Sequence, residues 1–285
     1  MSEPTTSCKF FVPDGLPPEQ ALARVTHLAI GAHPDDLEFM AIHGILECYN
    51  SVEQWFGGVT CTDGAGSSRR GSYHNISDQE MVELRAAEQQ EAASLGKYAV
   101  VAQLAHPSSH TKDPKHHQRL VDELATLFRR CQPRVLYSHQ PFDKHSTHLA
   151  VFSATLAAIR SLPAEMRPKR WLGCEVWRGL DWLPETRKVS LDVSAYPELS
   201  LELIRVFDSQ ISGGKGYDRA VVGRRFANAT FLDAHSSDEP TQITYAVDLS
   251  EFLRDETLSV RDFARTVLME FEQDIMQALT GTVGS

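Results

Sequence analysis

The sequence lacks the features that would direct a protein to a membrane or to a nucleic acid. No apolar run approaches the roughly 20 residues that a membrane-spanning helix needs, and residues 1–10 lack a basic region followed by a long apolar segment. The formal net charge is −10, so the electrostatic field of the protein opposes phosphate backbones and anionic membranes. We therefore expect a soluble, cytoplasmic protein that binds neither nucleic acid nor membranes.

Cysteine is scarce and its spacing carries no motif. The chain has five cysteines, an odd number, and no two of them form a CxxC pair. This argues against a disulfide framework and against a thiolate zinc site. We expect the cysteines to be small apolar core side chains in a reducing compartment.

Glycine-rich nucleotide-binding motifs are also missing. No GxGxxG sequence opens the first predicted helix, so dinucleotide binding is not expected. The run Gly213-Gly214-Lys215-Gly216 resembles part of a phosphate loop, but it follows a helix and lacks the GxxxxGK[ST] spacing. We interpret it as a turn that ends a helix.

What the sequence does contain is an alternation of short β-rich runs and helical stretches. With 285 residues and 42% hydrophobic content, the chain can bury a full core. Strands are predicted at 25–30, 56–62, 100–104, 135–139 and 171–178, and helices at 38–50, 78–96, 114–131 and 146–161. Beyond these, the pattern predicts strands at 189–193 and 244–249 and helices at 195–209, 218–229 and 259–279.

This alternation predicts an α/β fold with a mostly parallel sheet and helices on both faces. We expect a single Rossmann-like domain over residues 1–285, with a core at about 25–212 and a C-terminal elaboration at 213–285. Such sheets place their sites at the carboxyl ends of strands. The glycine- and serine-rich loop 62–77 follows one strand, so it is either a mobile substrate lid or an ordinary connection.

Two segments that directly follow predicted strands carry ionisable side chains. The first is His33-Pro34-Asp35-Asp36, and the second contains His145 and His148, three residues apart at a predicted helix start. Two imidazoles and one carboxylate with open positions are what a catalytic divalent metal needs, and the candidate ligands are His33, Asp36 and His148. Taken singly, each has a simpler explanation, because an Asp pair after a strand is often a helix cap.

The remaining two ionisable groups suit metal-assisted hydrolysis. A metal lowers the pKa of a bound water, and a free carboxylate beside it takes the proton, a role we assign to Asp35. His145 shares a helix face with His148 and could stabilise an oxyanion or donate a proton.

These residues together resemble the PIG-L/LmbE-like N-deacetylase family over roughly residues 25–212. The resemblance rests on Ala32-His33-Pro34-Asp35-Asp36-Leu37-Glu38-Phe39, Arg85-Ala86-Ala87-Glu88 with Leu95-Gly96, the span His145–His148, and Ser209-Gln210. It implies a zinc-dependent hydrolase that removes an acyl group, usually acetyl, from an amino sugar or its conjugate. It also implies zinc on His33, Asp36 and His148, Asp35 as general base, and His145 as oxyanion partner.

The resemblance further suggests two substrate-binding residues. Arg85 falls in the family's R-x-x-E helix pair and could reach substrate hydroxyls, although an i,i+3 surface ion pair with Glu88 is the simpler alternative. Asp63 could hydrogen-bond a sugar. Trp171, Trp177 and Trp182 offer flat faces for sugar stacking, but such residues are usually core.

The sequence departs from the family pattern at one site position. Many members have His-Pro-Asp-His where this chain has His145-Ser146-Thr147-His148, so the carboxylate that would orient the first histidine is missing. Asp143 is the candidate replacement. We expect His43 to be packed or capped, and His106, His110, His116 and His117 to be solvated.

The prediction is a zinc-dependent N-deacetylase acting on a small amino sugar or amino-sugar conjugate, with another divalent metal as an alternative cofactor. The alternatives are an amidase on a larger conjugate or a longer acyl chain, and a non-catalytic metal- or sugar-binding protein. Assembly into a homo-oligomer stays open.

Overall fold

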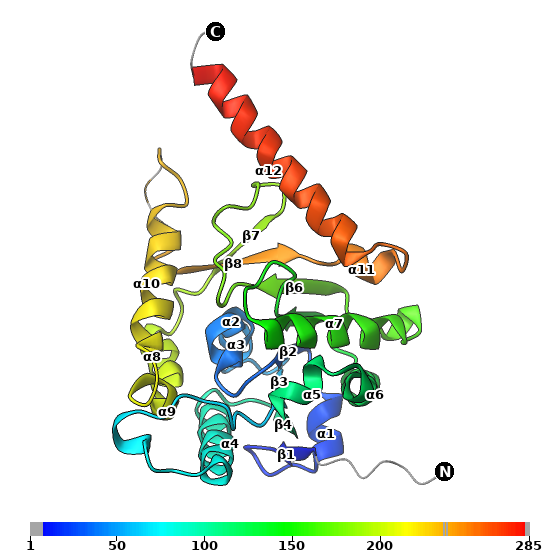
Figure 1. Ribbon diagram of the computed structural model, residues 1–285, viewed down its shortest axis with the longest axis vertical. Coiled ribbons are helices and arrows are strands. Elements are labelled where there is room, and N and C mark those ends of the chain that lie inside the picture. The colour runs from blue at the N-terminus through cyan, green and yellow to red at the C-terminus, as the bar shows by residue number, and fades with distance from the viewer. Residues whose placement is uncertain (1–7, 236, 238, 283–285) are drawn as a thin grey trace.

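The computed structural model describes residues 8–235, 237 and 239–282, and its centre is one eight-stranded sheet (Figure 1). The strand order is β1-β4-β3-β2-β5-β6-β8-β7. The strands are β1 (Lys9–Phe11), β2 (His27–Gly31), β3 (Phe56–Thr62), β4 (Val100–His106), β5 (Val135–Ser138), β6 (Arg170–Cys174), β7 (Lys188–Asp192) and β8 (Ile243–Asp248).

The five central strands, from β4 to β6, are parallel, and the three outer strands are antiparallel to their neighbours. The predicted mostly parallel α/β sheet is therefore confirmed. The chain adds β3 and β4 on one side of β2, and β5 and β6 on the other. The switch point of the sheet thus lies between β2 and β5, where such folds place their sites.

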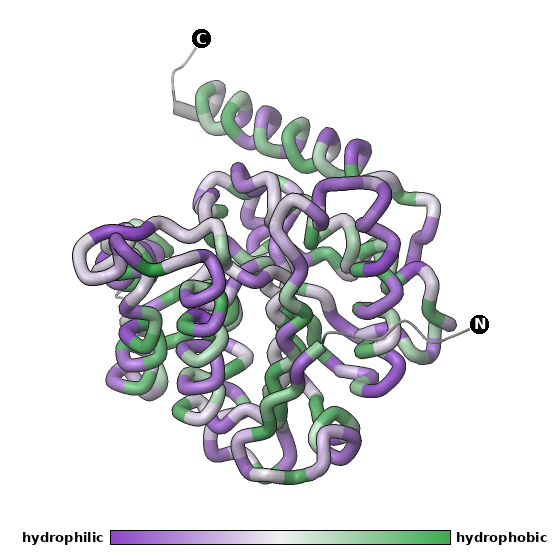
Figure 2. The backbone as a smooth tube through the Cα atoms, turned by 60° about the horizontal axis from the view of Figure 1, so that its bottom comes forward, coloured by the Kyte–Doolittle hydropathy of each residue, from purple (hydrophilic) through white to green (hydrophobic). Residues whose placement is uncertain are grey.

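Helices cover both faces of the sheet. They are α1 (Pro18–Ala23), α2 (Asp36–Met40), α3 (Ile42–Cys48), α4 (Asp78–Leu95), α5 (Ser108–Lys112), α6 (Pro114–Cys131), α7 (Ser146–Arg160), α8 (Pro197–Arg205), α9 (Asp208–Ile211), α10 (Tyr217–Thr230), α11 (Glu251–Arg254) and α12 (Val260–Thr282), with 3₁₀-helices η1 (Gly71–Tyr73) and η2 (Ala164–Met166). Helices α1, α6 and α7 contribute to one apolar cluster, and α3, α4 and α8 to a second one. Figure 2 shows the hydrophobic segments concentrated along the central strands.

Local signals explain where the long helices begin. Ser77 accepts the Glu80 N–H at the start of α4, while the Glu80 carboxylate accepts the Ser77 N–H, which is a capping box. Asp113 caps α6, and Pro114 occupies its first position. These two helices coincide with the predicted ranges to within a residue.

Other predictions needed correction. The helix predicted at 38–50 is split into α2 and α3 at Ala41, and the strand predicted at 171–178 ends at Cys174. The short elements β1, α1 and α5 were not predicted, because three to six residues give too little periodicity to recognise. All five cysteines are free, and Cys48, Cys61, Cys131 and Cys174 are buried, as expected for core side chains. Among the described helices, none combines the length and the apolar character needed to cross a membrane.

Candidate active site

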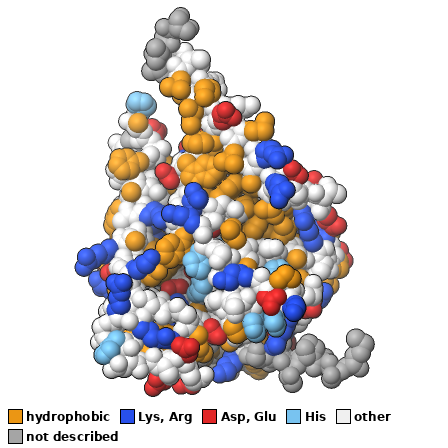
Figure 3. Space-filling view, viewed as in Figure 1, with side chains coloured by type: hydrophobic (Ala, Val, Ile, Leu, Met, Phe, Trp, Pro, Cys, Tyr) orange, Lys and Arg blue, Asp and Glu red, His pale blue; other side chains and the backbone are white. Residues whose placement is uncertain are grey.

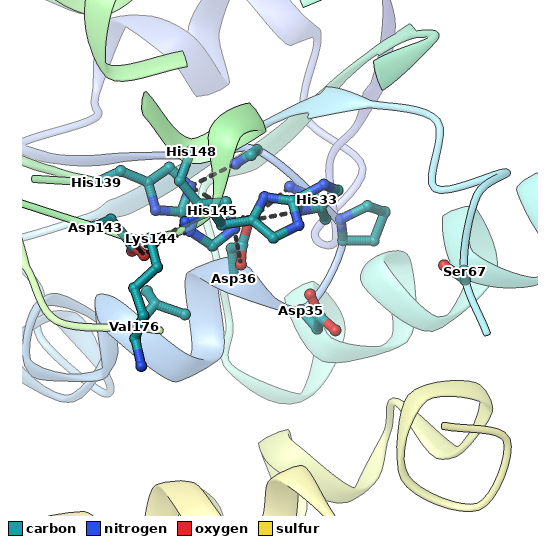
Figure 4. Close-up of polar contacts among 12 residues, drawn as sticks. His33, Asp35, Asp36, Ser67, His139, Asp143, Lys144, His145, His148 and Val176 are labelled. Atoms are coloured by element: carbon teal, nitrogen blue, oxygen red, sulfur yellow. Dashed lines mark hydrogen bonds and ion pairs between the residues drawn. The ribbon is translucent and has the colours of Figure 1, made fainter. Parts of the chain in front are cut away.

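The turn after β2 presents an imidazole and two carboxylates at the switch point. A Cβ atom at Gly31 would lie 2.9 Å from the Asp36 Cβ, so only glycine allows this close approach. Asp36 folds back on the turn: its Oδ2 accepts the His33 N–H at 2.7 Å and lies 3.2 Å from His33 Nδ1. Asp35 points away from the imidazoles of His33, His145 and His148, as Figure 4 shows.

Asp35 is held in an unusual backbone conformation. Its φ angle is +102°, a value that residues other than glycine seldom adopt and that often marks a functional site. The Asp35 N–H donates to Gln89 Oε1 at 3.2 Å, and the carboxylate lies 3.0 Å from Arg85 Nη2. Arg85 also donates to the Pro34 carbonyl, so one guanidinium contacts two adjacent residues of the turn.

The second segment runs from the end of β5 into the first turn of α7. Asp143 connects it internally: Oδ1 accepts the backbone N–H groups of Lys144 and His145, and Oδ2 lies 3.2 Å from His148 Nδ1. Asp143 therefore does not replace the missing carboxylate on the His145 ring. It orients His148 instead, because helical side chains lean toward the N-terminus and the His148 ring reaches back to this loop.

The two segments meet in one cluster of imidazoles around Asp36 (Figure 4). His148 Nε2 is buried, has no hydrogen-bond partner, and lies 3.4 Å from Asp36 Oδ1. Potential ligand atoms lie within 4.8 Å of one another in two groups, His33–His145–His148 and Asp36–His139–His148. The predicted ligands His33, Asp36 and His148 thus converge, with His145 beside them.

Burial and charge determine the protonation of this cluster. Burial lowers the pKa of His33, and it lowers the pKa of His139 and His145 to about 4, so these rings are neutral near pH 7. For His148, burial acts in the same direction, but Asp36 and Asp143 outweigh it and raise the pKa. Burial would raise the pKa of Asp36, yet His148 and His139 hold it well below the usual range.

Asp35 behaves differently from Asp36. Burial raises its pKa to about 7, against the opposing effect of the Arg85 guanidinium and with help from the Asp36 charge. A carboxyl group that titrates near neutrality suits a proton acceptor and donor.

The R-x-x-E pair is not a surface ion pair. Arg85 and Glu88 are 3% and 6% exposed, and each has other partners. Arg85 contacts Asp35 and donates to Ser67 Oγ, while Glu88 accepts the Ser209 N–H at 2.8 Å and the Ser209 hydroxyl at 2.6 Å. From one helix, Arg85 thus contacts the turn after β2 and loop 62–77, and Glu88 contacts α9.

The cluster opens into a cavity of about 570 Å³, within the usual range for a small-molecule site. Gly64, Gly66, Ser67 and Ser68 of loop 62–77 form part of its wall. The loop is tied down by the Arg70 N–H, which donates to the Gly213 carbonyl. Its opening as a lid stays a prediction.

The proposed substrate contacts differ in position. Arg85 lines the cavity, whereas Asp63 is not among the lining residues and accepts the Ala65 N–H. A sugar contact from Asp63 stays a prediction. Of the three tryptophans, only Trp177 lines the cavity; Trp171 is fully buried, and Trp182 packs on Phe142.

Sequence reasoning missed His139, which directly follows β5. It is fully buried, its ring stacks on His148 with centroids 3.8 Å apart, and its Nε2 accepts the Ala32 N–H at 2.9 Å. Because the Nε2 lone pair of His139 already accepts a hydrogen bond, we do not interpret His139 as a metal ligand. We interpret it as a residue that positions Asp36 and His148. Its position after a strand, like that of His33, was the signal available.

The remaining histidines largely follow expectation. His43 is packed, with Nδ1 2.8 Å from the Tyr137 hydroxyl. The prediction that His106 is solvated was wrong: Glu123 of α6 covers it, with His106 Nε2 2.5 Å from Glu123 Oε2.

The donor set fits a divalent metal. Imidazoles and one ionised carboxylate are typical zinc ligands, and the buried Nε2 of His148 lies in the cluster without a hydrogen-bond partner. Asp143 supplies the carboxylate that usually backs a ligating histidine.

Comparison with solved structures shows the same fold at low sequence identity. The 4-carboxy-2-hydroxymuconate hydratase GalB from Pseudomonas putida is 16% identical over 79% of this chain and 96% of its own, with a TM-score of 0.60. The N,N'-diacetylchitobiose deacetylase from Pyrococcus horikoshii is 17% identical over 78% and 83%, also with 0.60. The zinc-inhibited form of teicoplanin deacetylase Orf2 is 15% identical over 79% and 97%, with 0.53.

The sequence comparisons are more specific. A search of curated proteins found no match. Residues 28–159 match the family described as PIG-L: GlcNAc-PI de-N-acetylase, a range that includes His33, Asp36 and His148. The resemblance drawn from the sequence is thereby confirmed: residues 28–159 match the PIG-L family model, and the solved structures of similar fold include deacetylases.

Proposed function

We propose that this protein is a metal-dependent N-deacetylase that acts on an amino-sugar conjugate. The observation that carries the proposal is the separation of two carboxylates in one turn: Asp36 lies among the imidazoles, whereas Asp35 lies against Arg85. A reaction that needs both a ligand and a separate base is supported by this arrangement.

The fold alone does not select the reaction, because one of its relatives is described as a hydratase. The family match and the two relatives described as deacetylases favour amide hydrolysis. A cavity of about 570 Å³ can take more than a monosaccharide, which favours a conjugate.

His33, Asp36 and His148 would hold the metal, with zinc as the first candidate. When bound, it would lower the pKa of a coordinated water and polarise the amide carbonyl. Asp35 accepts the proton of the attacking water, and the new C–O bond forms. His145, neutral because its pKa is lowered, donates a hydrogen bond to the carbonyl oxygen. The C–N bond then breaks, the proton moves from Asp35 to the amine, and acetate and the amine leave.

The test is amine release from a panel of N-acetylated sugars and conjugates, before and after chelation and with zinc restored. We expect release that chelation abolishes and zinc restores. No release from any member, with zinc still bound, would favour an amidase on a larger conjugate or a non-catalytic binder.

Two variants separate the roles of the carboxylate and the imidazole. Asp35→Asn should keep the metal while turnover falls by roughly two to four orders of magnitude, the range for a lost general base. His148→Ala should lose the metal. Metal loss in Asp35→Asn would instead make Asp35 a ligand, and full occupancy in His148→Ala would contradict the proposed ligand set.

A further inference from the structure

One side of the cavity is cationic, although the protein carries a formal net charge of −10. Lys215 precedes α10, and Arg224 and Arg225 lie on it; all three line the cavity. We call these three residues the cationic wall. They lie outside residues 28–159, so the family match does not account for them.

Among the described residues, neither Lys215 nor Arg224 has an acidic partner. Lys215 Nζ lies 4.5 Å from the centre of the Trp177 ring, and Arg224 donates to the Val176 carbonyl. Among the described residues, no carboxylate lies within 4.0 Å of a side-chain nitrogen of Lys215 or Arg224. Lys215 is exposed and Arg224 half-buried, so both can reach a ligand.

Arg225 is a buried cation that forms no ion pair with the part of the chain that the structure describes. It is 2% exposed, and it donates to Ser200 Oγ at 2.8 Å and to the Glu38 carbonyl at 2.9 Å, while its Nε has no partner. Burial lowers its pKa to about 9, opposed by the charge of Glu175. A buried guanidinium of this kind is stabilised by a nearby anion.

Glu175 is the carboxylate on this side of the cavity, and its oxygens are already occupied. Oε1 accepts from Asn228 Nδ2 and the Tyr245 N–H, and Oε2 accepts from the Leu180 N–H. The lining of this side of the cavity thus contains three cationic side chains and the Glu175 carboxylate. At the other end of the cavity, Asp36 is shared by imidazoles and Asp35 is paired with Arg85.

The cationic wall is one side chain away from the catalytic cluster. Trp177 lies between them: its ring centre is 5.8 Å from that of His145 and 4.5 Å from Lys215 Nζ. Figure 3 shows Lys and Arg side chains gathered beside central histidine atoms on this face. A ligand with its amide at His145 could thus place a second group against Lys215.

We infer that the cationic wall binds an anionic group, a phosphate or a carboxylate, on the same conjugate whose amide is hydrolysed. The inference rests on the proposed function and narrows its substrate to acidic conjugates. The shared chemistry is an oxyanion, held by Lys215 and Arg224 through charge-assisted hydrogen bonds, with Arg225 behind them.

The experiment compares three N-acetylglucosamine derivatives: the neutral methyl glycoside, the 1-phosphate and the 1-O-carboxymethyl glycoside. We expect the zinc-loaded protein to prefer one or both anionic compounds by roughly tenfold or more in kcat/KM, the worth of a charge-assisted hydrogen bond. Comparing the phosphate with the carboxymethyl compound shows which of the two anionic groups the cationic wall prefers. The preference should weaken as salt concentration rises.

The variants Lys215→Gln and Arg224→Gln should lower kcat/KM for the anionic compounds by more than for the neutral glycoside and so remove this preference, while Arg224→Lys should keep it. The matched control is Arg219→Gln, which removes a charge from the exposed side of α10 and should change nothing. Equal losses on neutral and anionic compounds, or no preference in the unaltered protein, would overturn the inference.

Binding separates this inference from the proposed function. Calorimetry with Asp35→Asn measures affinity for the same compounds without turnover. Tighter binding of an anionic compound that depends on Lys215 and Arg224 supports the wall even if no acetyl group is ever released. Equal binding of all three compounds, in a protein that does release amine, would contradict anion binding by the cationic wall but not the proposed deacetylase function.

Discussion

Asp143 acts on two parts of the site through its two oxygens. Oδ1 fixes the backbone that starts α7, and Oδ2 faces His148 Nδ1. A carboxylate accepts hydrogen bonds only, so it requires the proton of His148 on Nδ1 and leaves the Nε2 lone pair for a metal. One residue thus sets both the position and the tautomer of a candidate ligand.

Replacing this carboxylate by an amide tests that role. In Asp143→Asn the amide can turn its NH₂ group toward His148 Nδ1, which would place the ring proton on Nε2. We expect zinc affinity to fall by roughly 10- to 100-fold, as for other lost partners of metal ligands. Competition with a chromophoric chelator measures it. Asp122→Asn on the exposed side of α6 is the control, and equal affinities in all proteins would contradict ligation through Nε2.

A second single-residue prediction concerns the close approach at Gly31. In Gly31→Ala the new methyl group would lie 2.9 Å from Asp36 Cβ and 3.2 Å from Leu37 Cδ2, so the turn must shift. We expect weaker metal binding and a loss of about 1–3 kcal/mol in the free energy of unfolding, typical of overpacking. Gly223→Ala, where a Cβ meets nothing within 4 Å, should cost no stability in a denaturant titration.

At the scale of elements, α4 connects three parts of the site. Arg85 reaches the turn after β2 and loop 62–77, and one turn later Glu88 reaches α9. The R-x-x-E spacing therefore directs two buried charges to different segments from one helix face. This placement gives the family motif a structural reason.

Breaking the link from α4 to α9 should affect binding more than chemistry. In Glu88→Ala the Ser209 N–H and hydroxyl lose their acceptor, so we expect about 2–4 kcal/mol lower stability. KM should rise more than kcat falls, because Gln210 beside Ser209 lines the cavity. Glu83→Ala on the exposed side of α4 is the control; a change confined to kcat would contradict a positioning role.

At the scale of the whole molecule, buried histidines make folding depend on pH. Burial lowers the pKa of His27 from 6.5 to about 4, with the charges of His43 and Arg134 adding to the effect. Between these values the unfolded chain binds a proton that the folded protein does not, so stability falls as pH decreases from 6.5 to 4. His27 alone should account for roughly 3 kcal/mol of that loss.

Denaturant titrations from pH 7 to 4, with chelator present, measure the predicted loss of stability at low pH. His27→Gln should show a smaller loss of stability toward pH 4 than the unaltered protein, and the difference isolates His27 from the other buried histidines. The exposed His74→Gln is the control. Parallel stability curves for all three proteins would show that His27 does not titrate as described.

Much of the fold could be predicted because its signals are local. The apolar run of β3 and the capped helices α4 and α6 are each specified by neighbouring residues. The residues His33, Asp35, Asp36, His145 and His148 could be singled out because they follow strands that end at one edge. His139 also follows a strand, but that position alone did not reveal its role, which depends on β2 lying beside β5.

Local signals in the sequence were enough to predict the strands from β2 onward, the segments that carry the site, and the resemblance to the family. Only the tertiary structure decided which groups are partners: Asp143 with His148, Arg85 with Asp35, and Arg225 with the Glu38 carbonyl, 187 residues away in the chain. The physical reason is that secondary structure follows local periodicity and capping, whereas a buried charge takes whichever partner the packing of distant segments brings within hydrogen-bond distance.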